Sequence, residues 1–596
     1  MSAEEVTRLR QEVSALQQQA KGANAGEPIY LGQYLLERLA QLGVTQMFGV
    51  PGDFNLGFLD LVEDHKSINW VGNCNELNAS YAADGYARVK WNSIGVLLTT
   101  FGVGELSAIN GLAGAFSEHV PILHIVGVPS TAQFKTKPML HHTLGDGRFD
   151  AYEKAAEQFT VAQAHLMSAE VAAAEIDRVL TSCVLSARPV YLTLPTDLVY
   201  TRVPSGRLLT PLPTFPPPNE PNTQEFVLNE IAKLVEEAQG NAVILVDACA
   251  VRHHVIKETR ELVKKTGFPV YSAPMGKGTV CEADERYGGI YVGSLTREDI
   301  KEKVENAKLI ISIGSLKSDF NTGNFTYSIP TERTIELHSD HTLVRYAYYP
   351  GLGMRRLLPE LTARLTAHEP TARSLPVPKF APSTPPPDDS PIITHDWMWQ
   401  RVGAFLRPRD VFVAETGTSS FGALDVPMPD DVTFVSQILW GSIGWTVGST
   451  LGAALAARDL GLGRTILFIG DGSLQLTVQE ISAMIRSGVA PILFVLNNSG
   501  YTIERYLHGR VRKYNDISNW KWTQLLSLFQ GLPEGEKPVG KSYTVSTKTE
   551  FDALLSDVDF AAAREIQLVE VMMDKFDAPR ALRRQAEVVK ARNSEF

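Results

Sequence analysis

The chain has 596 residues and a formal net charge of -11 at pH 7. Its length exceeds the roughly 250–300 residues at which one hydrophobic core stops growing, so we expect several domains. The acidic balance excludes a general affinity for nucleic acid phosphates, and no apolar run reaches the roughly 18 residues that a membrane-spanning helix needs.

The four cysteines, Cys74, Cys183, Cys249 and Cys281, are scattered and form no CxxC pair. This pattern predicts neither a disulfide scaffold nor a zinc site, and it fits a reducing compartment. The first residues carry charges of both signs and no apolar stretch, unlike a secretory signal. We therefore expect a cytoplasmic protein.

Residues 1–26 are predicted to be an N-terminal extension. Val6, Leu9, Val13 and Leu16 follow the 3-4-3 spacing of a heptad seam. Two heptads are too short for a stable coiled coil by themselves. We interpret this extension as a frayed or loosely docked helical tail.

Two proline-rich stretches, residues 204–221 and 370–391, are predicted to be linkers, because proline offers no amide donor to a helix or sheet. They delimit three domains, residues 27–203, 222–369 and 392–596. Within each domain, short apolar runs such as 94–99, 242–247 and 465–469 alternate with helical patterns. We predict three doubly wound α/β domains with mostly parallel sheets.

The most informative stretch is residues 464–500. An apolar strand pattern, 465–469, ends at Gly470-Asp471-Gly472-Ser473, and a helix with Thr477 and Glu480 spaced as a capping box follows. A second strand pattern, 492–496, ends at Asn497-Asn498. Parallel strands of a βαβ unit place Asp471 and Asn498 side by side. A carboxylate and an amide oxygen suit Mg²⁺, and the glycines and helix N-terminus suit a diphosphate.

Two other interpretations of this stretch stay open on the residues alone. A ligand-free protein could use the same residues as an Asp-Gly turn followed by a polar strand end. A dinucleotide site is the other possibility, but the turn lacks the GxGxxG spacing.

Residues 470–472 with 497–498 resemble the metal–diphosphate motif of thiamine-diphosphate-dependent enzymes. The resemblance runs from about Ile29 to Val589 and is closest to the pyruvate-specific branch of the 2-oxo acid decarboxylases. It implies thiamine diphosphate and Mg²⁺ as cofactors, with Asp471, Asn498 and the Gly500 carbonyl as metal ligands. The residues that it implies beside the cofactor in this region are Gly472, Ser473, Tyr501 and Thr502.

The same resemblance implies the catalytic residues, which are Asp53, Glu76, His141, His142 and Glu504. Glu76 would activate the cofactor's aminopyrimidine, which also makes it a cofactor-binding residue, and the others would exchange protons with intermediates. Taken alone, Glu76 would be a carboxylate near a helix N-terminus capped by Asn75. Taken alone, His141 and His142 would be surface residues.

Two further loops resemble cofactor-binding loops of the family. Thr416 and Thr418 belong to a loop on the diphosphate and pyrimidine side. Gly441, Ser442 and Ile443 belong to a turn in which the bulky Ile443 bends the cofactor and the Gly441 carbonyl accepts a hydrogen bond from the 4′-amine. Core packing would explain Ile443 equally well.

The implied reaction is the non-oxidative decarboxylation of pyruvate to acetaldehyde and CO₂ through a carbanion/enamine intermediate on thiamine diphosphate. The implied assembly is a homo-oligomer, at least a dimer and typically a tetramer, in which the Glu76 domain of one subunit faces the Asp471 domain of another. We expect neither a nucleic acid nor a membrane partner.

Three alternatives remain. An aromatic 2-oxo acid decarboxylase acting on indolepyruvate or phenylpyruvate would need only a larger pocket. An acetolactate-synthase-like carboligase would usually hold a flavin. A catalytically inactive, self-assembling scaffold would be expected to have lost site residues, and none is missing.

A regulatory role is the last expectation. Cys249 follows an apolar strand pattern, at the sheet edge where ligands usually bind. It resembles a cysteine implicated in substrate activation, and Glu118, His119 and Trp440 resemble the segments that relay the signal. A small buried hydrophobe is the alternative, and activity would require partial exposure and nearby positive charge from Arg252, His253 or His254.

Overall fold

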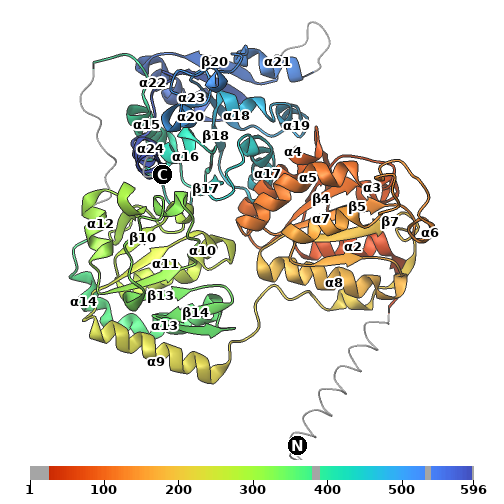
Figure 1. Cartoon of the computed structure of the whole chain (residues 1–596), viewed down its shortest axis with the longest axis horizontal. Helices are drawn as coiled ribbons and strands as arrows, with labels where there is room; N and C mark the ends of the chain where they lie inside the picture. The colour runs from red at the N-terminus through yellow and green to blue at the C-terminus, as the bar shows by residue number, and fades with distance from the viewer. Residues whose placement is uncertain (1–25, 379–388, 531–538, 594–596) are drawn as a thin grey trace, which may run out of the picture. The chain divides into compact units, whose positions relative to one another are not determined.

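The computed structural model describes residues 26–378, 389–530 and 539–593, and the chain divides into two compact units (Figure 1). Of the described residues, the first unit contains 26–83, 92–116 and 120–214, and the second contains 84–91, 117–119 and those from 215 onward. The heptad pattern of residues 1–26 and the centre of the second proline-rich linker lie outside the described residues. None of the described helices has the length and apolar character needed to cross a membrane.

The first unit is built on a six-stranded parallel sheet with the order β3-β2-β4-β5-β7-β6. Its strands, with the small antiparallel pair β1 and β8, are β1 (Pro28–Tyr30), β2 (Gln46–Gly49), β3 (Asn69–Gly72), β4 (Gly95–Thr100), β5 (Ile122–Val128), β6 (Gln163–His165), β7 (Val190–Pro195) and β8 (Arg202–Pro204). The helices that begin in this unit are α2 (Leu31–Gln41), α3 (Leu56–Glu63), α4 (Glu76–Val89), α5 (Val103–Ser117), α6 (Thr131–Thr136), α7 (Ala151–Ala156) and α8 (Ala169–Ser186).

The side chains of each strand point alternately to the two faces of the sheet, so this unit has a hydrophobic cluster on each face. Leu123 and Ile125 of β5 pack into a cluster with α2, α3 and α8, whereas Val126 and Val128 pack with Phe54 and the aromatic residues on the other side. Successive strand side chains point to opposite faces, and here both faces are covered. The strands are therefore continuously apolar, as expected for a parallel sheet.

The second unit contains two sheets. The first has the order β11-β10-β9-β12-β13-β14-β15, with parallel pairing as far as β13 and antiparallel pairing beyond it. Its elements are α9 (Pro221–Glu237), β9 (Ala242–Val246), α10 (Ala248–Arg252), α11 (Ile256–Thr266), β10 (Val270–Ser272), β11 (Tyr287–Ile290), α12 (Glu298–Glu305), β12 (Leu309–Ile313), β13 (Thr334–Leu337), β14 (His341–Val344), β15 (Ala347–Pro350), α13 (Met354–Leu365) and α14 (Glu369–Arg373).

The other sheet of this unit is fully parallel, with the order β17-β16-β18-β19-β21-β20. Its elements are α15 (His395–Phe405), β16 (Val411–Ala414), α16 (Thr418–Ala423), β17 (Thr433–Ser436), α17 (Trp445–Leu460), β18 (Thr465–Gly470), α18 (Asp471–Gln475), α19 (Glu480–Arg486), β19 (Ile492–Asn497), α20 (Thr502–Leu507), α21 (Leu525–Phe529), β20 (Lys541–Val545), α22 (Lys548–Ser556), α23 (Val558–Ala561), β21 (Gln567–Met572) and α24 (Arg580–Asn593). The strand order reverses between β16 and β18, which makes this point the expected ligand site of the sheet.

The predicted fold class, α/β with mostly parallel sheets, is confirmed. One local prediction was wrong, because the helix after Asp471 is split into α18 and α19 and has no capping box. The Thr477 hydroxyl instead donates to the Gly444 carbonyl at 2.6 Å. The predicted linkers also contain regular structure, since a 3₁₀ helix covers Gly206–Leu209 and α14 extends to Arg373.

Candidate active site

The switch point of the parallel C-terminal sheet gathers most of the predicted cofactor-binding residues. Strands β16, β18 and β19 are neighbours, and polar residues follow each of them directly. Thr416 and Thr418 follow β16, Asp471 follows β18 and Asn498 follows β19. The register pairs Gly470 with Leu496, so Asp471 and Asn498 leave the sheet side by side.

Asp471, Asn498 and the Gly500 carbonyl, which we call the oxygen cluster, converge behind this edge. The side-chain atom of Asn498 that faces the cluster lies 2.8 Å from the Gly500 oxygen and 3.1 Å from Asp471 Oδ1. If that atom is the amide nitrogen, it donates to both oxygens and Thr502 satisfies the amide oxygen. If it is the amide oxygen, three oxygens face one another, and only a cation between them would offset their repulsion.

Asp471 carries a second indication that the oxygen cluster suits a cation. Its Oδ1 accepts from the Gly472 amide at 2.8 Å, but its Oδ2 is buried and has no hydrogen-bond partner among the described residues. Burial raises the pKa of Asp471 to about 6, against backbone amides that lower it. A divalent ion would satisfy the orphaned oxygen, and carboxylate, amide and carbonyl oxygens are ligands that Mg²⁺ prefers.

Two glycines in this region allow close approaches that a side chain would block. A Cβ on Gly472 would lie 2.6 Å from the Tyr501 ring, and one on Gly500 would lie 2.1 Å from the Asn515 carbonyl oxygen. Gly500 also has a φ of +128°, which L side chains rarely adopt. The Tyr501 amide donates to the same Asn515 carbonyl at 3.0 Å. The close contacts with Tyr501 and Asn515 therefore restrain the backbone around the oxygen cluster.

The predicted cofactor loops at residues 416–418 and 441–443 are joined by two residues that we did not predict as site residues. The buried Glu415 accepts from the Thr416 amide at 2.9 Å and from the amide of Thr446, and burial raises its pKa to about 7. The Gln437 side chain accepts from the Ser442 amide at 2.8 Å, while its carbonyl accepts from the Thr416 hydroxyl at 3.1 Å. Neither residue has a sequence pattern of its own, because one partner of each is distant in sequence: Thr446 lies 31 residues after Glu415, and Thr416 lies 21 residues before Gln437.

Three side chains in or next to the predicted cofactor segments are exposed, namely Trp440, Ile443 and Glu504. Ile443 is 37% exposed and Trp440 is 41% exposed, although both are large and apolar. Glu504 lies in the first turn of α20 and is exposed. Ser473, in α18, is buried beside Asp471.

Glu118 supports the loop before Gly441. Its Oε1 accepts from the backbone amides of Ile438 at 2.8 Å, Leu439 at 2.7 Å and Trp440 at 3.3 Å. Its Oε2 accepts from Arg88 at 2.9 Å, and Arg88 also pairs with Asp84. A buried carboxylate with this many donors fixes the loop, so a change at Glu118 would be transmitted to the turn at Gly441.

In the first unit, the structure brings together three of the predicted catalytic residues, Asp53, His141 and His142, which we call the histidine cluster. His141 Nε2 lies 2.6 Å from Asp53 Oδ2, and the two side chains are 57% and 50% exposed. The rings of His141 and His142 are 4.7 Å apart, and Phe54 stacks on His141. His142 has a φ of +64°, and its carbonyl accepts from the Tyr152 hydroxyl at 2.7 Å.

Glu76 occupies the first position of α4, behind the cap that the sequence predicts. Asn75 Oδ1 accepts from the Asn78 amide at 2.8 Å. The Glu76 carboxylate is half-buried against the start of α5, where a Cβ on Gly104 would come within 3.0 Å of Oε1. Helix capping and a catalytic role are both compatible with this position.

Comparison with known proteins identifies relatives along nearly the whole chain. Three models of thiamine pyrophosphate enzymes match: the N-terminal TPP binding domain over residues 29–152, the central domain over 228–360 and the C-terminal TPP binding domain over 415–530. Pyruvate decarboxylase of Kluyveromyces lactis is 47% identical over 95% of this chain and 99% of its own length. Pyruvate decarboxylase isozyme 1 of Saccharomyces cerevisiae is 46% identical with the same coverage, and the Aspergillus fumigatus enzyme is 45% identical over 95% and 98%.

Proposed function

The chain belongs to the thiamine pyrophosphate enzymes and, among them, to the pyruvate decarboxylases, and on this premise we propose that it decarboxylates pyruvate to acetaldehyde and CO₂. Thiamine diphosphate is its cofactor, and we propose Mg²⁺ as the metal. The observation that carries the proposal is the oxygen cluster, a buried set of convergent oxygens at the switch point of the C-terminal sheet.

Within the second unit we assign the cofactor's polar end to the switch point. Asp471, Asn498 and the Gly500 carbonyl would hold Mg²⁺, because the Asn498 side-chain amide already lies 2.8 Å from the Gly500 oxygen and 3.1 Å from Asp471 Oδ1. The proposed neighbours of the cofactor are Thr416, Thr418, Gly441, Ser442, Ile443, Gly472, Ser473, Tyr501 and Thr502. When bound, thiamine diphosphate supplies the electron sink for the carbanion that loss of CO₂ leaves.

We assign Glu76 to proton transfer with the pyrimidine ring. A carboxyl group shares a proton with a ring nitrogen more effectively in a partly desolvated place, and Glu76 is half-buried beside Gly104.

The histidine cluster and Glu504 are assigned to the substrate carbon. Asp53 Oδ2 orients His141 through the 2.6 Å contact to Nε2, and imidazole is a side chain that exchanges protons near neutral pH. His142 lies next to His141, with the two ring centroids 4.7 Å apart. Protonated Glu504 would donate a hydrogen bond to the substrate carboxylate and avoid a repulsion between two negative charges.

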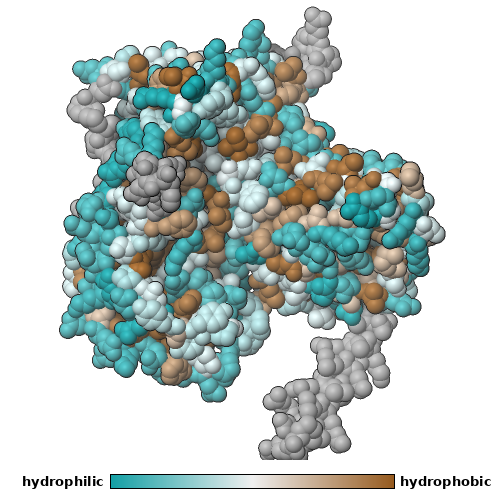
Figure 2. All heavy atoms as spheres, viewed as in Figure 1, coloured by the Kyte–Doolittle hydropathy of each residue, from teal (hydrophilic) through white to brown (hydrophobic). Residues whose placement is uncertain are grey.

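The catalytic residues are divided between the units, and we propose that a homodimer, assembled further into a tetramer, completes the site. Val103 and Leu106 of α5, next to Gly104, are 52% and 43% exposed. Figure 2 shows hydrophobic side chains gathered on the surface of the first unit where Figure 1 labels α4 and α5. Apolar surface beside site residues is typical of an interface that a second subunit covers.

The alternatives are less well supported. The aromatic 2-oxo acid decarboxylase is not favoured, because the relatives compared above carry the name pyruvate decarboxylase. The carboligase and the inactive scaffold stay alternatives to test, by flavin content and by turnover. A cytoplasmic location stays a prediction; all four cysteines are described and none forms a disulfide.

The regulatory role of Cys249 with Glu118 and His119 also stays a proposal. Cys249 is only 6% exposed, so a change in conformation would have to open its position to pyruvate. Arg252 supplies the nearby positive charge, whereas burial lowers the pKa of His254 to about 4 and leaves it neutral. Sigmoidal pyruvate dependence that is lost in Cys249→Ala supports this role, and hyperbolic kinetics in the unaltered enzyme contradict it.

The decisive experiment measures CO₂ and acetaldehyde from pyruvate with the full chain, first stripped of cofactor and metal. Activity should return only when thiamine diphosphate and Mg²⁺ are both added. Phenylpyruvate and indolepyruvate serve as competing substrates, and a higher kcat/KM on either would replace the proposal with the aromatic alternative. Activity without added cofactor, in a protein shown to contain none, would contradict it.

A further inference from the structure

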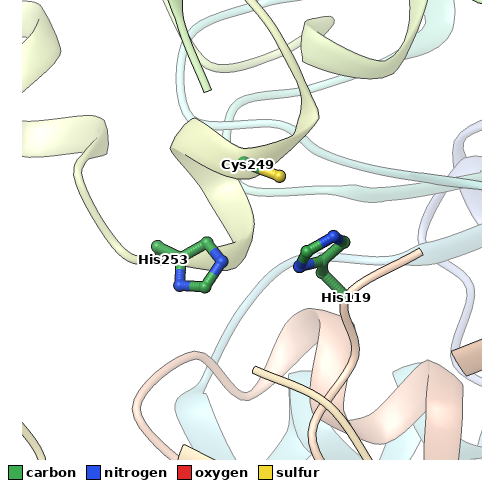
Figure 3. Close-up of side chains that lie close together, drawn as sticks. All are labelled: His119, Cys249 and His253. Carbon is green, nitrogen blue, oxygen red and sulfur yellow. The ribbon is translucent and has the colours of Figure 1, made fainter. Parts of the chain in front are cut away.

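A second set of metal-ligating side chains lies in the second unit, away from the oxygen cluster. It consists of Cys249, His253 and His119, which we call the thiol–imidazole cluster (Figure 3). One sulfur and two ring nitrogens all lie within 4.8 Å of one another. Cysteine spacing alone predicted no zinc site, because His119 is 130 residues from Cys249 in the sequence.

We propose that the thiol–imidazole cluster binds one divalent metal ion of the zinc class. Sulfur and imidazole nitrogen are the donors that zinc selects, whereas the hard ion Mg²⁺ selects oxygen. Ligand atoms around tetrahedral zinc lie about 3.3–3.6 Å apart, given zinc–ligand bonds of about 2.0–2.3 Å. The three atoms therefore need only small side-chain rotations to close on an ion, with one position left for water or an anion.

Two of the ligands share one face of a short helix. Cys249 lies in α10, and His253 is its C-cap, four residues later. This spacing brings side chains to the same face, and the His253 amide donates to the Cys249 carbonyl at 3.0 Å. Figure 3 shows both side chains leaving this turn on the side that faces His119.

The backbone holds α10 in place before any ion binds. The Cys249 amide donates to the Gly314 carbonyl at 2.9 Å, and Asp247 caps the helix by accepting from the Ala248 amide at 2.7 Å. A Cβ on Gly314 would lie 2.3 Å from the Ala250 nitrogen, so this close approach requires glycine. Ligands on a fixed backbone lose little entropy when they bind.

The third ligand is tied directly to the same helix. His119 has a φ of +57° and follows Glu118, whose carbonyl accepts from Arg252 Nε at 3.2 Å. Arg252 is next to His253, so one hydrogen bond connects the two ligand-bearing segments. The pair of arginines at the cluster, Arg252 and Arg88, is balanced by the carboxylates of Asp84 and Glu118. Cys249 would bind the ion as a thiolate and release its proton to solvent when the ion binds.

An ion in this cluster would restrain His119 and, with it, Glu118. Since Glu118 holds the backbone before Gly441, the ion would stiffen the turn assigned to the cofactor. This consequence for turnover rests on the proposed function, whereas metal binding itself does not. The two are separated by measuring binding without pyruvate or thiamine diphosphate.

The test uses the full chain in excess Mg²⁺, with Zn²⁺ counted by equilibrium dialysis and Co²⁺ followed by absorption. Wild type should bind one zinc more per chain than Cys249→Ala, and its cobalt form should show a thiolate-to-metal charge-transfer band. His253→Gln and His119→Asn should weaken binding at least tenfold. Asparagine tolerates the left-handed backbone of position 119, so that variant should fold.

Matched controls assign the band. Cys74→Ser and Cys281→Ser remove the exposed and half-buried thiols and should leave the band unchanged. The histidine cluster also offers three donors within 4.8 Å, but it contains no sulfur and contributes no such band. A wild-type protein without the band, or a band that persists in Cys249→Ala, overturns the proposal.

Discussion

The histidine cluster and the oxygen cluster differ in solvent exposure and in the groups that hold their side chains in place. In the histidine cluster, His141 and Asp53 are more than half and half exposed, and side-chain contacts join them. In the oxygen cluster, Asp471 is fully buried, and backbone atoms of Gly472 and Gly500 surround it. Groups that exchange protons benefit from access to solvent and substrate, whereas ion ligands must be held together and partly desolvated before the ion arrives.

The two clusters also differ in what their side chains contribute to the free energy of folding. An exposed pair such as Asp53–His141 contributes about 0–1 kcal/mol to folding. A buried carboxylate with an orphaned oxygen costs stability until a cation compensates it. We therefore expect changes in the oxygen cluster to abolish cofactor binding without unfolding the protein, and changes in the histidine cluster to affect only the chemistry.

The largest effect is expected for Asp471→Asn. Removing the charged ligand should weaken the binding of Mg²⁺ and thiamine diphosphate at least about 100-fold. The cofactor-free variant should be as stable as wild type or more stable, because a buried charge is gone. Equilibrium dialysis and thermal unfolding measure the two quantities, with the exposed Asp64→Asn as control. Wild-type affinity in the variant would contradict the metal assignment.

His142→Ala and Glu504→Gln should act in the opposite way. Each should slow acetaldehyde formation by about 10²–10⁴-fold, the usual effect of losing a general acid or base. Thiamine diphosphate affinity should stay within a factor of two, and rapid quench should show a trapped covalent adduct in at least one variant. His508→Gln and Glu587→Gln remove exposed side chains of the same kinds elsewhere in the second unit. Full turnover in both test variants would exclude the proposed roles.

Glu76→Gln distinguishes helix capping from catalysis. An amide cannot share a proton with the pyrimidine ring, so hydrogen–deuterium exchange at C2 of the bound cofactor should slow by about 100-fold or more. Stability should change little, because Asn75 still caps the helix. Nuclear magnetic resonance of the quenched cofactor measures the exchange. An unchanged rate would leave Glu76 with a structural role only.

The smallest expected effect is on the pH dependence of the free energy of unfolding, and it compares one buried carboxyl group in each unit. Burial raises the pKa of Glu415 from 4.5 to about 7, so the native carboxyl keeps its proton while the unfolded chain loses it. The free energy of unfolding should then fall as pH rises from about 4.5 to 7, by about 3 kcal/mol, and be level outside this window. Glu415→Gln should remove this contribution to the slope in urea titrations between pH 4 and 8.

The matched change in the first unit is Glu105→Gln. Glu105 is also buried and its pKa is also raised to about 7 by burial, and it accepts from the Gly102 amide and the Tyr191 hydroxyl at 2.7 Å each. Each single variant should lose part of the wild-type pH dependence. A wild-type slope that is undiminished in Glu415→Gln would mean that Glu415 is ionised in the native protein.

The oxygen cluster could be predicted from the sequence because its parts are close along the chain. Asp471 and Asn498 follow the two strands of one βαβ unit, and parallel pairing of adjacent strands places both at the same sheet edge. The fold class followed in the same way, from apolar runs covered on both faces. The split between α18 and α19 could not be predicted, because it depends on the contact of Thr477 with Gly444, 33 residues earlier.

Other contacts were decided by tertiary structure alone. The carboxylate of Glu118 reaches the amides of Ile438 and Leu439, which are more than 300 residues away, and His119 meets Cys249 and His253. No local sequence pattern identifies these partners, because a single glutamate or histidine shows neither periodicity nor motif spacing. The sequence determined the fold class, the family and the order of the site residues, because strand pairing and short motifs are local patterns. Which distant polar groups satisfy one another was decided only when burial forced each of them to find a partner.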